Sequence, residues 1–198
     1  MNSNLARVTP TTRMSFIILQ SQGRNNLICA EVGVYRGFNA LDMLRIDRTM
    51  YLHLVDAYTN IGRTDVYPGK LFYEGTPSVY VPQADPTEEC KQEAFENLRA
   101  YHDRITFVYK QSEEAHKDYQ DGFFDYIYID ADHDYGSVKN DMNVWWPKVK
   151  KGGILAGHDI SMTGVKKALF EFMDDNLLTH HGKLEGKGES DWWIFKTF

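Results

Sequence analysis

Ionisable side chains crowd into residues 130–134, where the sequence reads Asp-Ala-Asp-His-Asp directly after an apolar run. A second group, His158-Asp159, ends another apolar run further along the chain. Carboxylates such as Asp130 and Asp159 can hold a divalent cation that prefers oxygen ligands. An imidazole such as His133 or His158 can act as a general base near neutral pH. The two groups therefore predict a site for acid–base or metal-assisted chemistry, with a hydrogen-bonded cap network at a sheet edge as the alternative.

A glycine-containing turn follows the first apolar run, where residues 31–37 read Glu-Val-Gly-Val-Tyr-Arg-Gly. Gly33 and Gly37 allow a tight turn and a close backbone approach to a ligand before a helix begins. The pattern is not the GxGxxG of dinucleotide sites, because Glu31 occupies the position of the first glycine. A carboxylate there repels a pyrophosphate but can pair with a cationic amino-acid group of a ligand. A plain strand-to-helix turn is the alternative interpretation.

Two further polar residues follow apolar runs. Asp56 comes after the run at 51–55, where a carboxylate can accept both hydroxyls of a ribose, as the acidic residue of dinucleotide folds does. It could instead cap a turn or a helix. Ser112 follows the run at 105–109 and could serve equally as a ligand contact or as the N-cap of a short helix.

The elements that must position these residues alternate along the chain. Short apolar runs bounded by turn residues indicate buried strands, and segments with apolar residues at helical spacing separate them. We expect strands at 27–34, 51–55, 105–109, 124–129 and 154–157, with a turn at 151–153 that leads into the last of them. A further strand at 191–198 should close a hairpin. Helices are expected at 39–45, 86–102, 112–119, 135–149 and 163–176. This alternation predicts a doubly wound α/β fold whose mostly parallel sheet carries an antiparallel edge. Ligands bind at the carboxyl ends of such strands, so the polar residues above should meet at one rim.

Residues 58–85 interrupt this alternation with glycines, prolines and interleaved tyrosines and phenylalanines. A loop of this length inside a compact domain is usually functional or disordered, and its aromatic content argues against disorder. We therefore interpret this insert as a lid or an acceptor-binding segment, with a packing insertion as the alternative. No repeat or linker divides the chain, so 1–198 is expected to form a single domain.

Composition argues against several classes of protein. The 198 residues are 42% hydrophobic and 25% charged, as in ordinary globular domains, and the net charge is −6. Lysines and arginines are scattered, which disfavours nucleic acid as a partner. No apolar stretch is long enough to span a membrane, and Cys29 and Cys90 lie far apart, which suits a reduced cytoplasmic setting.

These motifs resemble those of the class I S-adenosylmethionine-dependent methyltransferases, in the small-molecule O-methyltransferase branch that includes catechol O-methyltransferase and the sugar O-methyltransferases of antibiotic pathways. The similarity covers residues 27–198 apart from the aromatic insert. Residues 30–40 match the first motif of the branch, and residues 126–159 match its Asp-x-Asp-His-x-Tyr, Gly-Gly and final His-Asp pattern. Residues 164–168 and the Trp-Trp pair near the C-terminus also belong to it. The resemblance implies a Rossmann-like fold with a mostly parallel seven-stranded sheet and an antiparallel C-terminal hairpin.

Carried over position by position, the resemblance implies a site for S-adenosylmethionine. The implied cofactor-binding residues are Glu31, Gly33, Tyr35 and Gly37 of the first motif, Asn39 at the methionine carboxylate, Asp56 at the ribose, Ser112 at the adenine, and Asp130. The implied ligands for Mg²⁺ or another divalent cation are Asp130, His158 and Asp159. His158 replaces a hard carboxylate, which weakens a magnesium site. His133 stands where the catechol enzymes have a lysine base, so His133 and His158 are the candidate catalytic residues.

The implied activity is transfer of a methyl group to a hydroxyl of a small molecule, of sugar or phenol type. A sulfonium methyl is transferred by in-line displacement, for which the protein mainly supplies alignment, while the acceptor hydroxyl needs a base or a metal ion. Two other interpretations stay open: an oxidoreductase that uses NAD on the same architecture, and a hydroxylase-like or non-catalytic relative that binds the cofactor. The oligomeric state is also open, and a homodimer is among the options.

Overall fold

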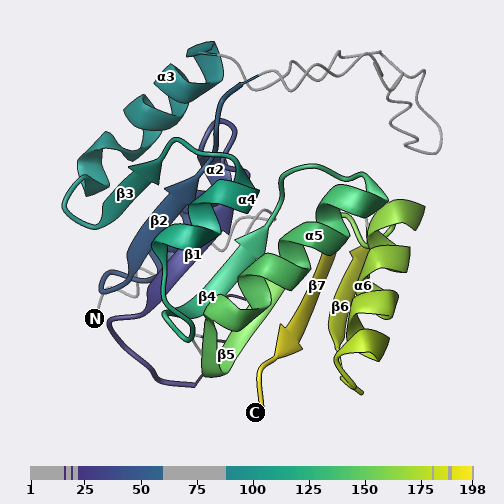
Figure 1. The fold of residues 1–198 in the computed structure, drawn as a ribbon. Helices are drawn as coiled ribbons and strands as arrows, with labels where there is room; N and C mark the ends of the chain where they lie inside the picture. The colour runs from purple at the N-terminus through teal and green to yellow at the C-terminus, as the bar shows by residue number, and fades with distance from the viewer. Residues whose placement is uncertain are drawn as a thin grey trace.

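The computed structural model describes residues 16, 19, 22–59, 88–179, 181–186 and 189–197. Most of the aromatic insert expected at 58–85 lies outside the described residues, so its role as a lid stays a prediction. The described strands form one seven-stranded sheet in the order β3-β2-β1-β4-β5-β7-β6, parallel from β3 to β5 and antiparallel at β7 and β6 (Figure 1). The predicted mostly parallel sheet with an antiparallel C-terminal hairpin is confirmed.

Most elements begin and end close to their expected positions. The strands are β1 Ile28–Val32, β2 Tyr51–Val55, β3 Ile105–Val108, β4 Phe124–Ile129, β5 Val149–Gly157, β6 Gly182–Gly186 and β7 Glu189–Phe195. The helices are α2 Phe38–Ile46, α3 Glu88–Leu98, α4 Ser112–Ala115, α5 Tyr135–Trp145 and α6 Thr163–Asp175, with 3-10 turns at Arg99–Tyr101, His116–Asp118 and Trp146–Lys148. None of the described helices is long and apolar enough to cross a bilayer.

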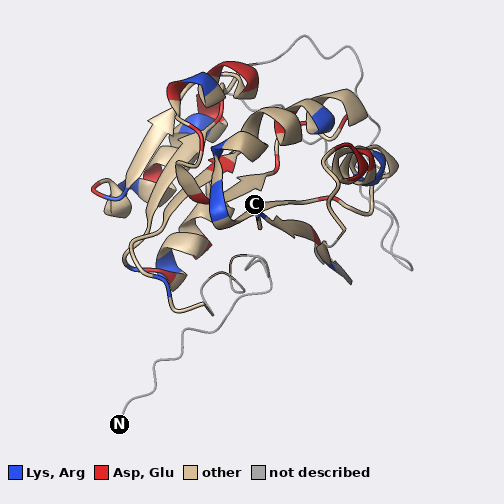
Figure 2. Cartoon of the chain, turned by 60° about the horizontal axis from the view of Figure 1, so that its bottom comes forward, with Lys and Arg blue, Asp and Glu red and all other residues tan. Residues whose placement is uncertain are grey.

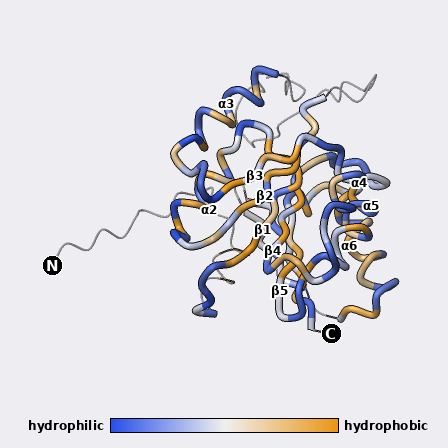
Figure 3. Tube along the Cα trace, turned by 60° about the vertical axis from the view of Figure 1, so that its left-hand side comes forward, coloured by the Kyte–Doolittle hydropathy of each residue, from blue (hydrophilic) through white to orange (hydrophobic). Residues whose placement is uncertain are grey.

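Helices cover both faces of the sheet (Figure 1). One buried cluster joins the sheet to α2 and α3 through side chains such as Met43 and Leu98. A second cluster joins the opposite face to α5 and α6 through side chains such as Trp145 and Phe172. The central strands are therefore packed against apolar side chains on both faces, which is why their sequences read as continuous apolar runs. These strands are largely hydrophobic along their length (Figure 3). Charges of both signs are interspersed over the helices (Figure 2).

The helix expected at 135–149 is shorter than predicted. It ends at Trp145, and a 3-10 turn that contains Pro147 follows it. Proline has no backbone N–H to donate and its ring clashes with the preceding turn, so an α-helix does not continue through it.

The fifth strand begins earlier than predicted, at Val149 rather than at 154. Residues 151–153 therefore lie inside β5 instead of forming the turn into it, and a register irregularity between β4 and β5 accommodates them. Glycine is needed at 153, because a Cβ there would lie 2.7 Å from the carbonyl oxygen of Asp125.

The order of strands reverses at β1, which pairs with β2 on one side and with β4 on the other. The chain leaves β1 toward α2 on one face of the sheet and leaves β4 toward α5 on the opposite face. Loops that diverge in this way open a crevice at the carboxyl ends of the two strands, which is the usual ligand position in doubly wound sheets.

Candidate active site

A cavity of about 660 Å³ opens at this switch point, between the loops after β1, β2 and β4, the start of α4 and one side of α5. Its volume suits a small organic ligand. The predicted site residues that line it are Glu31, Gly33, Tyr35, Asn39, Asp56, Ser112, Asp130 and His133. Three other predicted residues, Gly37, His158 and Asp159, do not line it.

Gly33 allows the loops after β1 and β4 to touch. Its φ is +89°, and a Cβ at this position would lie 2.2 Å from the carbonyl oxygen of Asp130. A backbone hydrogen bond from the N–H of Asp130 to the oxygen of Val32, at 2.8 Å, joins these two strand ends, and a second from the N–H of Gly33 to the oxygen of Val55, at 2.9 Å, joins the end of β1 to β2. The close approach of these two loops, which carry most of the predicted site, therefore requires glycine at position 33.

Glu31, near the end of β1, is buried in the cavity wall and is 1% exposed. Asn39, in the first turn of α2, donates from Nδ2 to Oε1 of Glu31 at 2.7 Å. Gly37 precedes α2 with φ +75°, and its Cα faces the side chain of Leu98. A buried carboxylate is costly unless cations or hydrogen bonds stabilise it, so Glu31 favours a positively charged group in the ligand.

Asp56, directly after β2, accepts hydrogen bonds from three backbone N–H groups. Its Oδ2 accepts from Val34 and Tyr35 at 2.9 Å each, and its Oδ1 accepts from Tyr58 at 2.8 Å. Tyr35 and Tyr58 have φ of 51° and 48°, a strained region for residues other than glycine, and Asp56 holds both. Asp56 therefore caps these turns, which is the alternative role that the sequence left open for it. A carboxylate has about four acceptor positions, so Asp56 retains capacity for one further hydrogen bond to a ligand.

Ser112 forms a hydrogen-bonded network with Asp141, which the sequence analysis did not single out. Its Oγ donates to Oδ1 of Asp141 at 2.5 Å and accepts from Nε1 of Trp145 at 2.8 Å. Ser112 does not act as the N-cap of α4, because Gln111 holds that position. The signal for Asp141 was the set of small and polar residues on one side of α5, which are Gly136, Ser137, Asn140 and Asp141.

Burial raises the pKa of Asp141 to about 6; the hydrogen bond from Ser112 opposes this shift and the charge of Glu113 adds to it. An aspartate in the unfolded chain has a pKa of about 3.9, so the folded state binds this proton more tightly and loses stability as pH rises from about 4 through about 6. We expect the stability of Asp141→Asn relative to the natural chain to increase by roughly 2–3 kcal/mol between pH 4 and pH 8.

Urea unfolding at the two pH values measures this difference. The matched control is Asp103→Asn, which changes an exposed aspartate and should show no such trend. A pH-independent difference for Asp141→Asn would mean that the carboxyl group of Asp141 titrates as it does in the unfolded chain.

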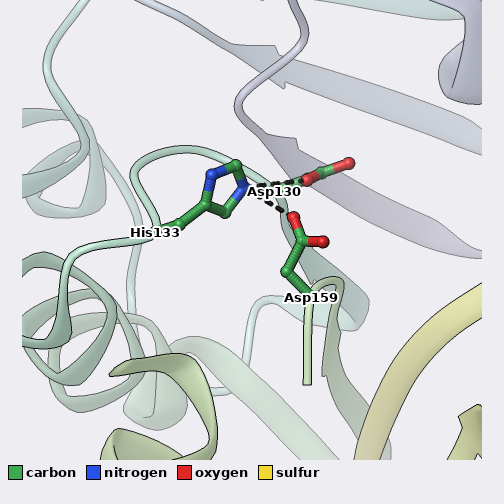
Figure 4. A group of neighbouring side chains, drawn as sticks. All are labelled: Asp130, His133 and Asp159. Carbon is green, nitrogen blue, oxygen red and sulfur yellow. Dashed lines mark ion pairs between the residues drawn. The ribbon is translucent and has the colours of Figure 1, made fainter. Parts of the chain in front are cut away.

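Asp130, His133 and Asp159 converge where the ends of β4 and β5 meet (Figure 4). Nε2 of His133 lies 2.9 Å from Oδ2 of Asp159 and 3.6 Å from Oδ1 of Asp130. Nδ1 of His158 lies 3.2 Å and 3.9 Å from the same two oxygens. One ligand atom from each of Asp130, His133 and Asp159 falls within 4.8 Å of the others, which is close enough to bind one ion. This group includes His133, which the sequence predicted as a base, and does not include His158, which the resemblance implied as a ligand.

The protonation of this cluster follows from its charges. Burial disfavours the imidazolium form of His133, but the carboxylates of Asp130 and Asp159 outweigh it and raise the pKa of His133 to about 9. Burial likewise opposes ionisation of Asp159, yet His133 and His158 hold the pKa of its carboxyl group well below the usual range. The two carboxylates therefore favour the imidazolium form of His133, and its role as a general base stays a prediction.

The strand order, the antiparallel last pair of strands and a ligand-sized cavity at the switch point define the class I, Rossmann-like methyltransferase fold. A family model described as a methyltransferase domain matches residues 30–160, and the chain belongs to this family. The class of enzyme that the motifs at 30–40 and 126–159 predicted is thereby confirmed. Among curated proteins, none matches the chain significantly.

Solved structures share this fold at low sequence identity. An O-methyltransferase from Bacillus cereus in complex with SAH (S-adenosylhomocysteine) has a TM-score of 0.60 at 13% identity, and the match covers 90% of this chain and 76% of that one. For a precorrin-6y C5,15-methyltransferase from Geobacter metallireducens, the TM-score is 0.58 at 11% identity, with 90% and 84% covered. For a precorrin 8w decarboxylase from Methanobacterium thermoautotrophicum, it is 0.55 at 14% identity, with 85% and 80% covered. These proteins differ in their described reactions, so the acceptor has to be argued from the site.

Proposed function

We propose that this methyltransferase binds S-adenosylmethionine in the cavity and transfers its methyl group to a hydroxyl of a small molecule, of sugar or phenol type. The observation that carries the proposal is that Glu31, Asp56 and Ser112 surround one cavity of about 660 Å³. Each stands where the resemblance implies a contact to a different part of the cofactor: the methionine end, the ribose and the adenine. The related fold from Bacillus cereus that holds SAH supports the same class of cofactor.

The charge of the cavity favours this cofactor over a dinucleotide. The acidic residues that line it are Glu31, Asp56, Glu113, Asp130, Asp132 and Asp141. Of the lining cations, Arg36 pairs with Glu93, and Lys110 pairs with Asp118. Such a lining attracts the ammonium and sulfonium groups of S-adenosylmethionine and repels the pyrophosphate of NAD.

Aromatic side chains at the cavity support a sugar or phenol as the acceptor. Phe38 lines the cavity and is 55% exposed, and Tyr35 and Tyr58 also belong to the lining. An exposed aromatic ring at a ligand site can pack against a flat ring or against the apolar face of a sugar.

The Asp130–His133–Asp159 cluster is placed to act on the acceptor hydroxyl, because Asp130 and His133 belong both to the cluster and to the cavity lining. A divalent cation lowers the pKa of a hydroxyl that it contacts. Asp130 and Asp159 would hold such an ion, and the loop contact at Gly33 holds Asp130 at the cavity in which the methyl donor would bind. The protein's own part is then to align the acceptor oxygen with the methyl carbon and sulfur.

Asp56→Asn tests the cofactor assignment. We expect it to weaken the affinity for S-adenosylhomocysteine by roughly 10–100-fold, because one charge-assisted hydrogen bond to a ribose hydroxyl is worth about 1.5–3 kcal/mol. Calorimetric titration measures the affinity. Asp103→Asn, at an exposed position away from the cavity, is the control, and circular dichroism checks that the loops held by Asp56 stay folded. Unchanged affinity would remove Asp56 from the cofactor site.

A further inference from the structure

The donor atoms at the ends of β4 and β5 do not suit the hard ion of the catechol enzymes. Mg²⁺ takes oxygen ligands and keeps several waters. Here His133 and His158 each place a ring nitrogen within 4 Å of the carboxylates of Asp130 and Asp159. Imidazole is a ligand of iron, nickel, copper and zinc rather than of magnesium. The side chains at this position therefore suit a transition-metal ion better than they suit Mg²⁺.

The separations between these atoms match the edges of a coordination shell. They are 2.9 and 3.6 Å for His133 and 3.2 and 3.9 Å for His158, each measured to the same oxygens of Asp159 and Asp130. Ligand atoms about 2.1 Å from one ion lie about 3.0 Å apart at adjacent octahedral positions and about 3.4 Å apart in a tetrahedron. One ion can therefore reach the ligand atoms of Asp130, His133 and Asp159, which all lie within 4.8 Å of one another, whereas His158 lies beside this group and is not a member of it.

The surroundings of Nε2 of His133 also support an ion at this position. Its Nε2 is inaccessible to solvent and makes no hydrogen bond within the part of the chain that the structure describes, although Asp159 lies 2.9 Å away. By contrast, the ion pair of Lys150 with Asp125, at 2.8 Å, is also a well-formed hydrogen bond. The imidazole of His133 and the carboxylate of Asp159 therefore lie close together without forming a hydrogen bond. Two ligands of one metal ion are arranged in the same way.

We propose that Asp130, His133 and Asp159, with His158 beside them, bind a first-row transition-metal ion of the Fe²⁺ to Zn²⁺ series in preference to Mg²⁺, with Nε2 of His133 as a direct ligand. This inference deepens the proposed function and rests on it only for what the ion does to an acceptor hydroxyl. It also removes His133 from the role of base, because its ring nitrogen is committed to the ion.

The test is direct binding of Co²⁺ and of Mg²⁺ to the full chain, after metal removal with EDTA and gel filtration. Calorimetry gives both affinities, and the visible absorption of Co²⁺ reports nitrogen ligation independently of turnover. We expect one Co²⁺ per chain, bound at least roughly 100-fold more tightly than Mg²⁺. His133→Ala should weaken Co²⁺ binding by at least roughly 10-fold and change its spectrum, while Mg²⁺ binding changes little.

His102→Ala is the matched control, because His102 is exposed and far from the cluster in sequence and in contacts. Equal affinity of the natural chain for Co²⁺ and Mg²⁺, absence of Co²⁺ binding, or full Co²⁺ affinity in a folded His133→Ala would overturn the proposal. If His133→Ala does not fold, the affinities of the natural chain decide alone. A chain that binds Co²⁺ but not S-adenosylhomocysteine would contradict the proposed function and leave the ion site standing.

Discussion

Gly33→Ala is expected to abolish binding of S-adenosylhomocysteine, with a loss of affinity of at least roughly 100-fold and a loss of about 3–5 kcal/mol in the free energy of unfolding. Two costs add at this position. The φ of +89° is one that alanine rarely adopts, and the new Cβ would lie 2.2 Å from the carbonyl oxygen of Asp130 and 2.6 Å from Cα of Ala131. These are backbone atoms, so the loops after β1 and β4 must separate, and the two walls of the cavity move apart with them.

Gly23→Ala separates the two costs. Gly23 also has a positive φ, of 68°, but a Cβ there meets no atom within 4 Å. This variant should lose only about 1–2 kcal/mol of stability from backbone strain and should keep its affinity for S-adenosylhomocysteine. Urea unfolding and calorimetric titration give both quantities for both variants. If Gly33→Ala binds the ligand as well as Gly23→Ala does, the contact between the two loops is not what forms the cavity.

Removal of divalent ions with EDTA is expected to lower the rate of methyl transfer by roughly 10²–10⁴-fold. Without an ion the acceptor hydroxyl keeps its proton, and the pKa of His133, raised to about 9, leaves that residue protonated at pH 7. The measurement follows label from methyl-labelled S-adenosylmethionine into a panel of phenols and sugars, before EDTA, after EDTA, and after ions are restored.

Two substitutions sharpen this experiment. Asp130→Asn and Asp159→Asn should both be partly rescued by a higher ion concentration, because each weakens the ion site without removing it. Asp103→Asn, exposed and outside the cluster, should behave as the natural chain does. Full activity in EDTA would contradict the ion, and it would make His158 the candidate base.

The fold and the location of the site could be predicted from local patterns. Buried parallel strands leave long apolar runs, and each run here ends in a polar residue that the strand order then brings to one rim. That is why Glu31, Asp56 and Asp130 were expected at one cavity, and they line it. The errors occurred at the junction of α5 and β5, where Pro147 ends the helix and an irregular β5 absorbs a glycine pair that reads as a turn.

Contacts between residues that are distant in sequence could not be predicted. Asp141 lies in the middle of a helix and meets Ser112 only because α4 and α5 pack side by side, so the polar side of α5 marks it as a lining residue but does not predict its partner. The backbone bonds of Asp56 depend on left-handed conformations at Tyr35 and Tyr58, which are rare for tyrosine and have no sequence signal.

The most direct test of the account is a comparison of labelled S-adenosylmethionine with labelled NAD by equilibrium dialysis against the purified chain. We expect saturable binding of one S-adenosylmethionine per chain, competition by S-adenosylhomocysteine, and a marked loss of binding in Gly33→Ala but not in Gly23→Ala. NAD should bind at least roughly 100-fold more weakly, because its pyrophosphate would face the acidic lining. Saturable binding of NAD without binding of S-adenosylmethionine would contradict the account.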